Sequence, residues 1–289
     1  MGMVDDYLAA LAANDPQRLP WSARAGYTEN AAALRVSEGL WATATRIGTF
    51  RLVFADPAQS SVAFFGTVLE NGSPVILGLR LRIEGHRIVE AEHIVMRDAS
   101  AARRFAARAE DPLMAVRAAQ GRRASRAELA AAAEAYFDGI EAISAANIPF
   151  AKNCNRIENG RQTTNVTDLA NGPFLELASP SWRAVLAQGC AGSIDSGANA
   201  HITQVRARRT VVIDEAASTA VAAVIFDHAG TIATTHLPGQ PEIAFPQQLR
   251  QPFDTLVLEA FKLDADKQIV RVEAVGTVLP LGTLSGWEK

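Results

Sequence analysis

The sequence contains little of what marks several large classes of protein. Two cysteines in 289 residues, Cys154 and Cys190, are too few for a disulfide framework or for a four-ligand zinc site. We expect two semi-buried thiols, and a bridge between them is the alternative. No apolar run reaches the roughly 18 residues that a membrane-spanning helix needs. Neither a disulfide-rich scaffold nor a membrane span is therefore predicted.

The charge balance is close to neutral. Charged residues make up 20% of the chain and the net charge is −3, which argues against a nucleic-acid or anionic-membrane partner. The first ten residues, MGMVDDYLAA, are acidic where a secretory signal is basic, and they lack a hydrophobic core segment. We therefore expect a cytoplasmic protein with no nucleic-acid and no membrane partner.

Familiar catalytic motifs are also missing. The chain has no G-x-G-x-x-G, no G-x-x-x-x-G-K-[ST], no G-x-S-x-G and no H-E-x-x-H, which are the patterns of phosphate cradles, nucleophile elbows and zinc proteases. The histidines are widely scattered, at His86, His93, His201, His228 and His236. We expect no metal and no cofactor, so any catalysis would be acid–base chemistry in an apolar pocket.

What the chain does contain is an internal duplication. Three pairs of features are separated by the same 129 positions (136 minus 7, for example): Tyr7 and Tyr136, Pro20 and Pro149, and the dipeptides Glu29-Asn30 and Glu158-Asn159. Further along, Asp56 matches Asp214, and RIEGHRIVEAE at 82–92 matches KLDADKQIVRVE at 262–273 with one inserted residue. A constant offset over some twenty residues indicates two copies of one structural unit.

Each copy changes from helical to strand periodicity. Apolar spacing predicts a helix over 4–14 and a longer one over 127–146. Alternating apolar stretches with Asp-Pro, Asn-Gly and Glu-Gly turns then predict antiparallel strands. The fold class is α+β, with two tandem domains of helices on a curved antiparallel sheet that form a pseudo-dimer in one chain.

The boundaries follow from composition. We place the first repeat at 1–110, a helical and solvated connector at 111–126, and the second repeat at 127–289. Segments near 160–180 and 229–252 are rich in Asn, Thr, Pro and Gln, so they are predicted to be loops inserted in the second repeat.

These pieces resemble a known superfamily. The opening helix of each half, RIEGHRIVEAEHI and the matching KLDADKQIVRVEAV are similar to the nuclear transport factor 2-like fold of ketosteroid isomerase, scytalone dehydratase and SnoaL-like cyclases. The second half also resembles an uncharacterised two-repeat family of bacteria and fungi, through FAKNCNRIENGRQTT, GCAGSIDSGANAHITQVRARRTVVIDE, VIFDHAG and LPLGTLSGW. The resemblance implies a cone-shaped α+β fold with an apolar cavity. It does not fix the chemistry, because such folds host isomerases, dehydratases, lyases, hydrolases and binding proteins.

His93 is the first candidate for a catalytic base. Strand alternation places Val89, Ala91, His93 and Val95 on one face, and a histidine on an apolar face is either a satisfied core residue or a base in a hydrophobic pocket. In the resembled superfamily the last strands line the cavity and contribute an acid or base. The matching position in the second repeat is Ala274, which cannot ionise.

The recurring Glu-Asn pair is the second candidate. In the first repeat, Glu29 beside Asn30 can abstract a proton and hydrogen-bond the resulting oxyanion, since burial raises the pKa of a carboxyl group. The same pair recurs as Glu158 and Asn159. The recurrence favours the alternative, a structural role that both repeats need.

Four more residues are candidates for proton donation or substrate contact. Tyr27 precedes the first Glu-Asn pair and can serve as a phenol donor. Arg156, at the same place in the second repeat, either binds a ligand carboxylate or pairs with a neighbour on its strand. Trp41 either stacks on an aromatic ligand or packs in the core. His201 stands where the two-repeat family has an aromatic residue, whereas His228 is interpreted as a turn residue.

The sequence favours a cofactor-independent lyase or isomerase acting by proton abstraction on a small hydrophobic molecule of aromatic, polyketide or terpenoid type. Its catalytic residues would be His93, Glu29 and Tyr27, and its substrate-binding residues Asn30, Trp41, Arg156, Glu158, Asn159 and His201. The alternative is a non-catalytic small-molecule-binding or scaffold protein. A homo-oligomer is left open.

Overall fold

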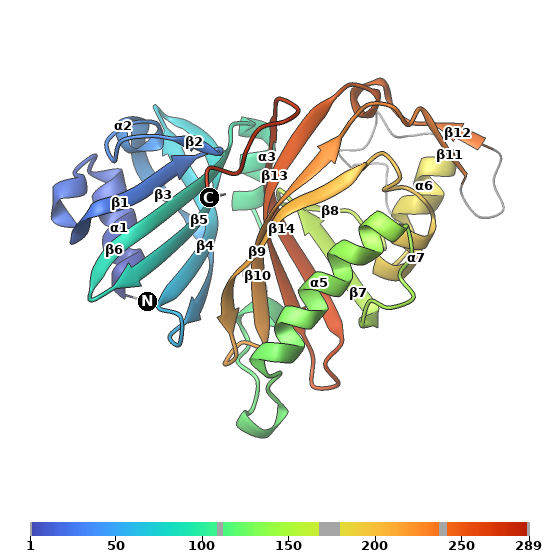
Figure 1. Ribbon diagram of the computed structural model, residues 1–289, viewed down its shortest axis with the longest axis horizontal. Helices are drawn as coiled ribbons and strands as arrows, with labels where there is room; N and C mark the ends of the chain where they lie inside the picture. Colours follow the sequence, from blue (N-terminus) through green and yellow to red (C-terminus); the bar gives the residue numbers. More distant parts are fainter. Residues whose placement is uncertain (1, 109–111, 168–179, 237–241, 288–289) are drawn as a thin grey trace.

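A computed structural model of the chain describes residues 2–108, 112–167, 180–236 and 242–287. Two six-stranded sheets dominate it (Figure 1). The first has the order β2-β1-β6-β5-β4-β3 and comprises β1 (Trp21–Glu29), β2 (Ala32–Ala33), β3 (Ala44–Asp56), β4 (Ser61–Glu70), β5 (Ser73–Glu84) and β6 (Arg87–Met96). The second has the order β8-β7-β14-β13-β10-β9 and comprises β7 (Phe150–Glu158), β8 (Arg161–Gln162), β9 (Gln204–Asp214), β10 (Thr219–His228), β13 (Phe253–Leu263) and β14 (Ile269–Leu279).

The two sheets share one topology. In each, the first strand runs parallel to the last, as β1 with β6 and β7 with β14, and the remaining pairs are antiparallel. The predicted mixed α+β architecture with two tandem sheets is confirmed. The domain boundaries and the cone shape stay predictions.

One main helix covers the outer face of each sheet. The helix α1 (Gly2–Ala12) packs Val4, Leu8 and Leu11 against the first sheet. The helix α5 (Arg126–Ala142) packs its apolar stripe against the second, and its start is fixed by a capping box in which Ser125 and Glu128 bond each other's backbone. No helix within the described ranges is long and apolar enough to cross a membrane.

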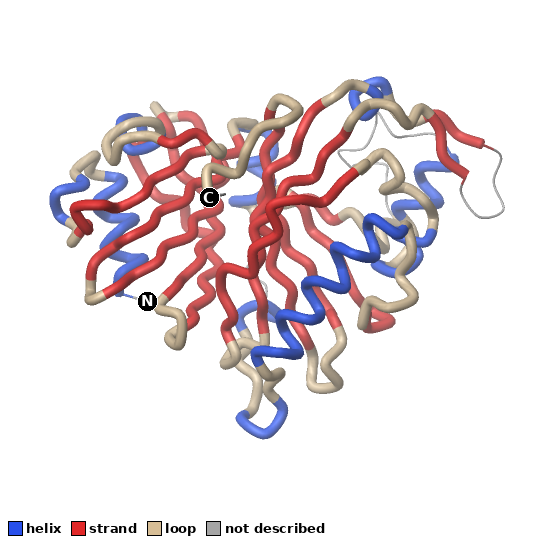
Figure 2. Tube along the Cα trace, viewed as in Figure 1, coloured by secondary structure: helices blue, strands red, loops and turns tan. Residues whose placement is uncertain are grey.

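The other faces of the two sheets pack on each other. Apolar side chains of β3, β4, β5 and β6 share one core with those of β9, β10, β13 and β14. Figure 2 shows the strands meeting in the middle of the molecule with helices to either side. Strands such as β4 and β10 are buried along nearly their whole length, because a helix layer covers one face and the partner sheet the other.

A reciprocal pair of carboxylates spans this interface. Asp56 Oδ2 accepts a hydrogen bond from the Ile213 amide at 3.0 Å, and Asp214 Oδ2 accepts one from the Ala55 amide at 3.0 Å. Each carboxylate therefore accepts a hydrogen bond from the backbone amide of the residue directly before the other aspartate. This symmetry confirms the correspondence of Asp56 and Asp214 deduced from the sequence.

The recurring asparagines occupy equivalent turns. Asn30 has a φ of 49° and exchanges two hydrogen bonds with the backbone of Val95, at 3.0 and 2.7 Å. Asn159 has a φ of 47° and does the same with Gly276, at 3.1 and 3.0 Å. Asparagine tolerates left-handed backbone, and its amide can replace a strand partner. The pattern favours the structural role over substrate contact for both residues.

The segments between the sheets contain more structure than the composition indicated. The helix α3 (Ala99–Ala106) buries Phe105 against Phe50, with ring centroids 5.1 Å apart. The predicted connector holds α4 (Pro112–Ala115) and a 3-10 helix at Gln120–Arg122.

The prediction of plain loops in the second repeat needs correction. Within 229–252, β11 (Thr234–His236) pairs with β12 (Glu242–Ala244), because Thr235 is buried and bonds the backbone of Gly197. Of the other insertion, near 160–180, residues 168–179 lie outside the described part.

The end of the chain returns to the first half. Trp287 Nε1 donates to Thr28 Oγ1 at 3.0 Å, and its ring lies 4.8 Å from the guanidinium carbon of Arg80. Gly286 allows the turn, with a φ of 77° and the Ala31 carbonyl where a Cβ would lie. The C-terminal segment therefore ties the two halves together.

Candidate functional site

The interior of the first half contains a continuous chain of polar side chains. Trp41 Nε1 donates to the Tyr7 hydroxyl at 3.1 Å, and that hydroxyl lies 2.8 Å from His93 Nε2. The Tyr27 hydroxyl lies 3.2 Å from His93 Nδ1 and donates to Glu29 Oε2 at 3.1 Å. The Tyr27 hydroxyl has one proton and donates it to Glu29, so it can only accept a hydrogen bond from His93. His93 therefore donates from Nδ1 to Tyr27 and accepts at Nε2 from the Tyr7 hydroxyl.

The centre of this cluster is enclosed. His93 and Tyr7 have no exposed surface and Trp41 keeps 1%. Burial, with a contribution from Arg97, lowers the pKa of His93 to about 3, so the ring is neutral at pH 7. Burial likewise raises the pKa of both tyrosines. The structure thus gathers the first-repeat candidates into one network, and every hydrogen-bonding atom of the His93 ring already has a partner.

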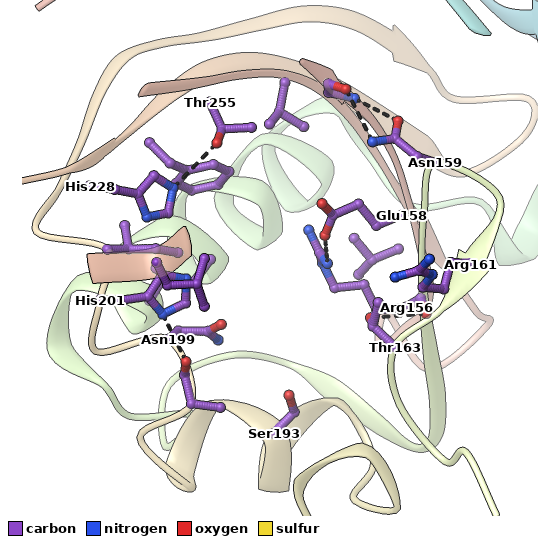
Figure 3. Close-up of a pocket in the computed structure, with 18 of the residues that line it drawn as sticks. Arg156, Glu158, Asn159, Arg161, Thr163, Ser193, Asn199, His201, His228 and Thr255 are labelled. Atoms are coloured by element: carbon purple, nitrogen blue, oxygen red, sulfur yellow. Dashed lines mark hydrogen bonds and ion pairs between the residues drawn. The ribbon is translucent and has the colours of Figure 1, made fainter. Parts of the chain in front are cut away.

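A cavity lies inside the second half (Figure 3). Its volume is about 680 Å³, within the range of sites that hold drug-sized molecules. Apolar side chains make up much of the wall, including Tyr136, Ile140, Phe150, Trp182, Val185, Leu186, Ile194, Phe226, Phe253 and Val257. Its polar groups are Arg156, Glu158, Asn159, Arg161, Thr163, Thr164, Ser193, Asn199, His201, His228, Gln248, Gln251, Thr255 and Thr277.

The two interiors differ because the connection that follows β2 in the first half differs from the one that follows β8 in the second half. In the first half it spans 34–43 and forms the short helix α2 (Leu40–Thr43), which places Leu40 and Trp41 in the interior. In the second half it spans 163–203 and forms α6 (Pro180–Leu186) and α7 (Cys190–Asp195), which border the cavity. The described helices of this longer connection, α6 and α7, border the interior.

A disulfide fixes this cover. Cys154 on β7 and Cys190 at the start of α7 are bonded, with Cα atoms 5.6 Å apart. This corrects the preferred expectation of two thiols. The bridge holds α7, which carries Ser193 and Ile194, against the strand that carries Arg156 two residues further on.

Arg156 is the centre of a charge cluster at the cavity wall. Its Nη1 donates to Glu158 Oε2 at 2.6 Å, and its Nε donates to Glu259 Oε1 at 3.2 Å and to the Tyr136 hydroxyl at 3.0 Å. Tyr136 in turn donates to Glu259 Oε1 at 3.2 Å. The Nη2 group of Arg156 bonds no protein atom within the described ranges, so it is available to an oxygen of a bound molecule.

The pKa values of the two carboxyl groups in this cluster are shifted in opposite directions. Burial alone would raise the pKa of Glu158, but Arg156 outweighs it and holds that pKa below its ordinary value. For Glu259, the effect of burial is larger than the opposing effect of Arg156, so the pKa of Glu259 is raised. Glu158 keeps 42% of its side chain accessible and Glu259 none. Carboxyl groups with opposite shifts are typical of acid–base sites.

Two histidines lie on the opposite wall. The rings of His201 and His228 stack at 5.0 Å and 20°, and His228 stacks on Phe253 at 4.1 Å and 16°. Burial lowers the pKa of His201 to about 4 and that of His228 to about 3, so both rings are neutral at pH 7. His201 Nδ1 lies 3.0 Å from the Ala198 carbonyl, which can only accept. Its Nε2 therefore carries a lone pair.

Figure 3 shows the two groups facing each other across the cavity, with His201 and His228 on one side and Arg156, Glu158 and Arg161 on the other. A neutral base and a cation on opposite walls can remove a proton from a bound molecule and stabilise the charge that develops. Among the described residues, no group of three or more histidine, cysteine, aspartate or glutamate side chains is placed to hold a metal ion.

Four predicted substrate-binding residues line this cavity, namely Arg156, Glu158, Asn159 and His201. Sequence reasoning missed Glu259 and interpreted His228 as a turn residue. In the structure, Glu259 pairs with Ala274 across β13 and β14 as Leu79 pairs with His93 across β5 and β6. The ionisable side chain of this strand pair is thus His93 on the last strand of the first sheet, and Glu259 on the neighbouring strand β13 of the second.

Comparisons with known proteins give weak structural similarities. A protein from Sphaerobacter thermophilus is 13% identical over 33% of this chain and 94% of its own, with a TM-score of 0.28. A hypothetical protein with a ketosteroid isomerase-like fold from Catenulispora acidiphila, solved with trimethylamine, is 18% identical over 32% of this chain and 82% of its own, with a TM-score of 0.25.

The comparison with curated proteins finds no match. A protein-family model does match, over residues 122–276, and it is described as a domain of unknown function (DUF8021). The match contains β7, α7 and the strands that surround the cavity, and it covers more than half of the 289 residues. The chain belongs to the DUF8021 family.

Proposed function

We propose that the cavity of the second half is the working site of a cofactor-independent lyase or isomerase for a small, largely apolar molecule. The observation that supports this most is the placement of neutral His201 opposite the Arg156–Glu158 pair in one apolar-walled cavity of about 680 Å³. A neutral imidazole accepts a proton, and low-dielectric walls strengthen the field of the opposing charges.

The chemical step uses His201 as the base. Its Nε2 takes a proton from a carbon next to an electron-withdrawing group of the substrate, and the electron pair of the broken C–H bond moves onto that group. The negative charge that develops is stabilised by the Nη2 group of Arg156 on the facing wall. The imidazolium then returns the proton to another carbon, which isomerises the substrate, or to a leaving oxygen, which eliminates water.

The first-half cluster is the less supported location for this chemistry. His93 has hydrogen-bond partners at both ring nitrogens, Tyr7 and Tyr27, and no exposed surface. A role of His93, Glu29 and Tyr27 in catalysis remains a prediction.

Hydrogen–deuterium exchange tests the proposal without knowledge of the natural substrate. The probe is 1-indanone, whose C–H groups next to the carbonyl exchange slowly in D₂O, followed by proton NMR with and without protein. We expect acceleration by the wild type and a loss of about 100-fold or more in His201→Gln, the usual range for a general base. The matched control His236→Gln changes an exposed histidine of β11 and should exchange like the wild type.

The outcomes separate the two functional classes. Equal exchange by His201→Gln and the wild type would refute His201 as the base. Saturable binding of 1-indanone with no acceleration in the wild type would refute the enzyme and support the non-catalytic binding protein.

A further inference from the structure

An aromatic pair is preserved between the two halves. Tyr7 and Trp21 meet edge to face, with ring centroids 5.9 Å apart at 62°. The residues 129 positions later, Tyr136 and Phe150, meet in the same way at 6.1 Å and 87°. The duplicated scaffold thus presents the same two-ring platform in both interiors.

In the first half, a side chain of the protein itself occupies this platform. The indole of Trp41 packs edge-on against Tyr7 at 5.1 Å and 70° and against Trp21 at 6.1 Å and 67°. Its Nε1 donates to the Tyr7 hydroxyl at 3.1 Å, and the side chain is 1% exposed. The platform therefore holds a planar bicyclic ring by ring–edge contacts and one hydrogen bond.

In the second half, the same platform borders the cavity. Tyr136 and Phe150 both line it. Of the matching connection the structure describes 163–167 and 180–203, and there Trp182 packs against Phe245 at 5.6 Å. The space next to the platform that an indole fills in one copy is thus open to a ligand in the other.

We infer that the second-half cavity takes a planar bicyclic aromatic molecule with a ring N–H or O–H donor, seated on Tyr136 and Phe150 as Trp41 is seated on Tyr7 and Trp21. The inference rests on the proposed function in one respect, since it names the substrate class of the same cavity. The position of the Trp41 indole in the first half thus indicates the size, shape and donor group of the ligand in the second half.

The hydrogen bonding around Tyr136 leaves its hydroxyl able to accept from one further donor. A hydroxyl oxygen donates once and accepts twice. Tyr7 donates to His93 and accepts from Trp41. Tyr136 donates to Glu259 and accepts from Arg156, which leaves one lone pair for a ring N–H or O–H of the ligand.

The size of the cavity adds a second feature of the ligand. A volume of about 680 Å³ exceeds what a bare bicyclic ring fills, because sites of this size hold drug-sized molecules. The ring therefore carries a substituent that extends toward the far wall, where His201 and His228 lie. This arrangement brings the reacting carbon of the substituent near the base.

The test compares indole with 1-methylindole, which has the same ring system without the N–H donor, by isothermal titration calorimetry. We expect indole to bind roughly two- to tenfold more tightly, the usual effect of one hydrogen bond. Tyr136→Phe should abolish this preference. Tyr7→Phe is the matched control, because its platform is already filled by Trp41, and it should keep the preference of the wild type. Ser193→Trp, which places an indole in the cavity from α7, should abolish binding of both probes.

These binding results test the inferred ligand class independently of whether the protein catalyses a reaction. No saturable binding of indole, or a preference for indole that survives in Tyr136→Phe, would overturn the inference even if 1-indanone exchange depends on His201. Binding with the expected preference would uphold it even if the protein accelerates no exchange.

Discussion

At the scale of single residues, the two halves differ in whether their buried polar groups reach a cavity. Strand alternation and the 129-residue offset were enough to predict that Tyr27, Glu29 and His93 come together, and the structure brings them within hydrogen-bond distance. The enclosure by Trp41 could not be predicted, because it depends on how a connecting segment folds back. Glu259 was missed for a related reason, since a carboxyl group in an apolar strand gives no periodic signal.

The pKa of His201 determines the pH profile. Burial lowers it to about 4, so the neutral, proton-accepting form persists well below the ordinary value of 6.5. We expect exchange of 1-indanone to stay constant from pH 7 down to about 5 and to fall only as the pH approaches 4. A fall centred near 6.5 would contradict the role of this buried ring.

A substitution of His93 distinguishes the two interiors. Because its ring is fully buried and bonds Tyr7 and Tyr27, His93→Ala should lower the free energy of unfolding by ~2–4 kcal/mol, measured in urea. Exchange of 1-indanone should change less than about twofold. Loss of exchange in a variant that stays folded would instead assign the base to His93.

At the scale of elements, the connection that follows the second strand of each sheet decides which interior is open. The comparison of the two repeats predicted extra segments in the second copy, and their Asn, Thr, Pro and Gln content predicted loops there. It could not place α7 over the cavity or pair Cys154 with Cys190, because a separation of 36 residues does not determine a distance in space.

The disulfide should therefore support both stability and binding. Closure of a 36-residue loop contributes roughly 3–4 kcal/mol by restricting the unfolded chain. The double variant Cys154→Ala, Cys190→Ala should unfold earlier in urea by about this amount and bind indole more weakly, because α7 loses its tether to β7. Reduction of the wild type should reproduce both effects and leave the double variant unchanged.

A thiol titration of the unreduced, unfolded protein checks the bridge itself. It should find no free thiol, whereas two thiols would restore the expectation from the sequence. Disulfides persist mainly in oxidising compartments, so the bridge weighs against the cytoplasmic location that the charge of the first residues favoured.

At the scale of the whole molecule, duplication is the feature that the sequence predicted best. Matching residues indicated two copies of one unit and the equivalence of Asp56 and Asp214, and the reciprocal bonds agree with that equivalence. Which faces of the sheets pack together could not be predicted, since strands buried on both sides show no alternation.

The shared interface predicts a single unfolding transition. The two sheets bury one common apolar core, and the reciprocal carboxylates join their backbones. Circular dichroism and tryptophan fluorescence should therefore give coincident curves in urea. Asp56→Ala and Asp214→Ala should each shift the whole curve by ~1–3 kcal/mol, because each leaves a buried amide unpaired. Two separate transitions would show that the halves are independent.

The central claim is that one of two duplicated interiors has become a site while the other is filled by its own tryptophan. The most direct measurement is a crystal structure of the protein soaked with 1-indanone. The account predicts one molecule per chain, between His201 and Arg156, and an undisturbed Trp41 on Tyr7. A molecule bound within the Tyr7–His93 cluster, or one molecule in each half, would contradict it.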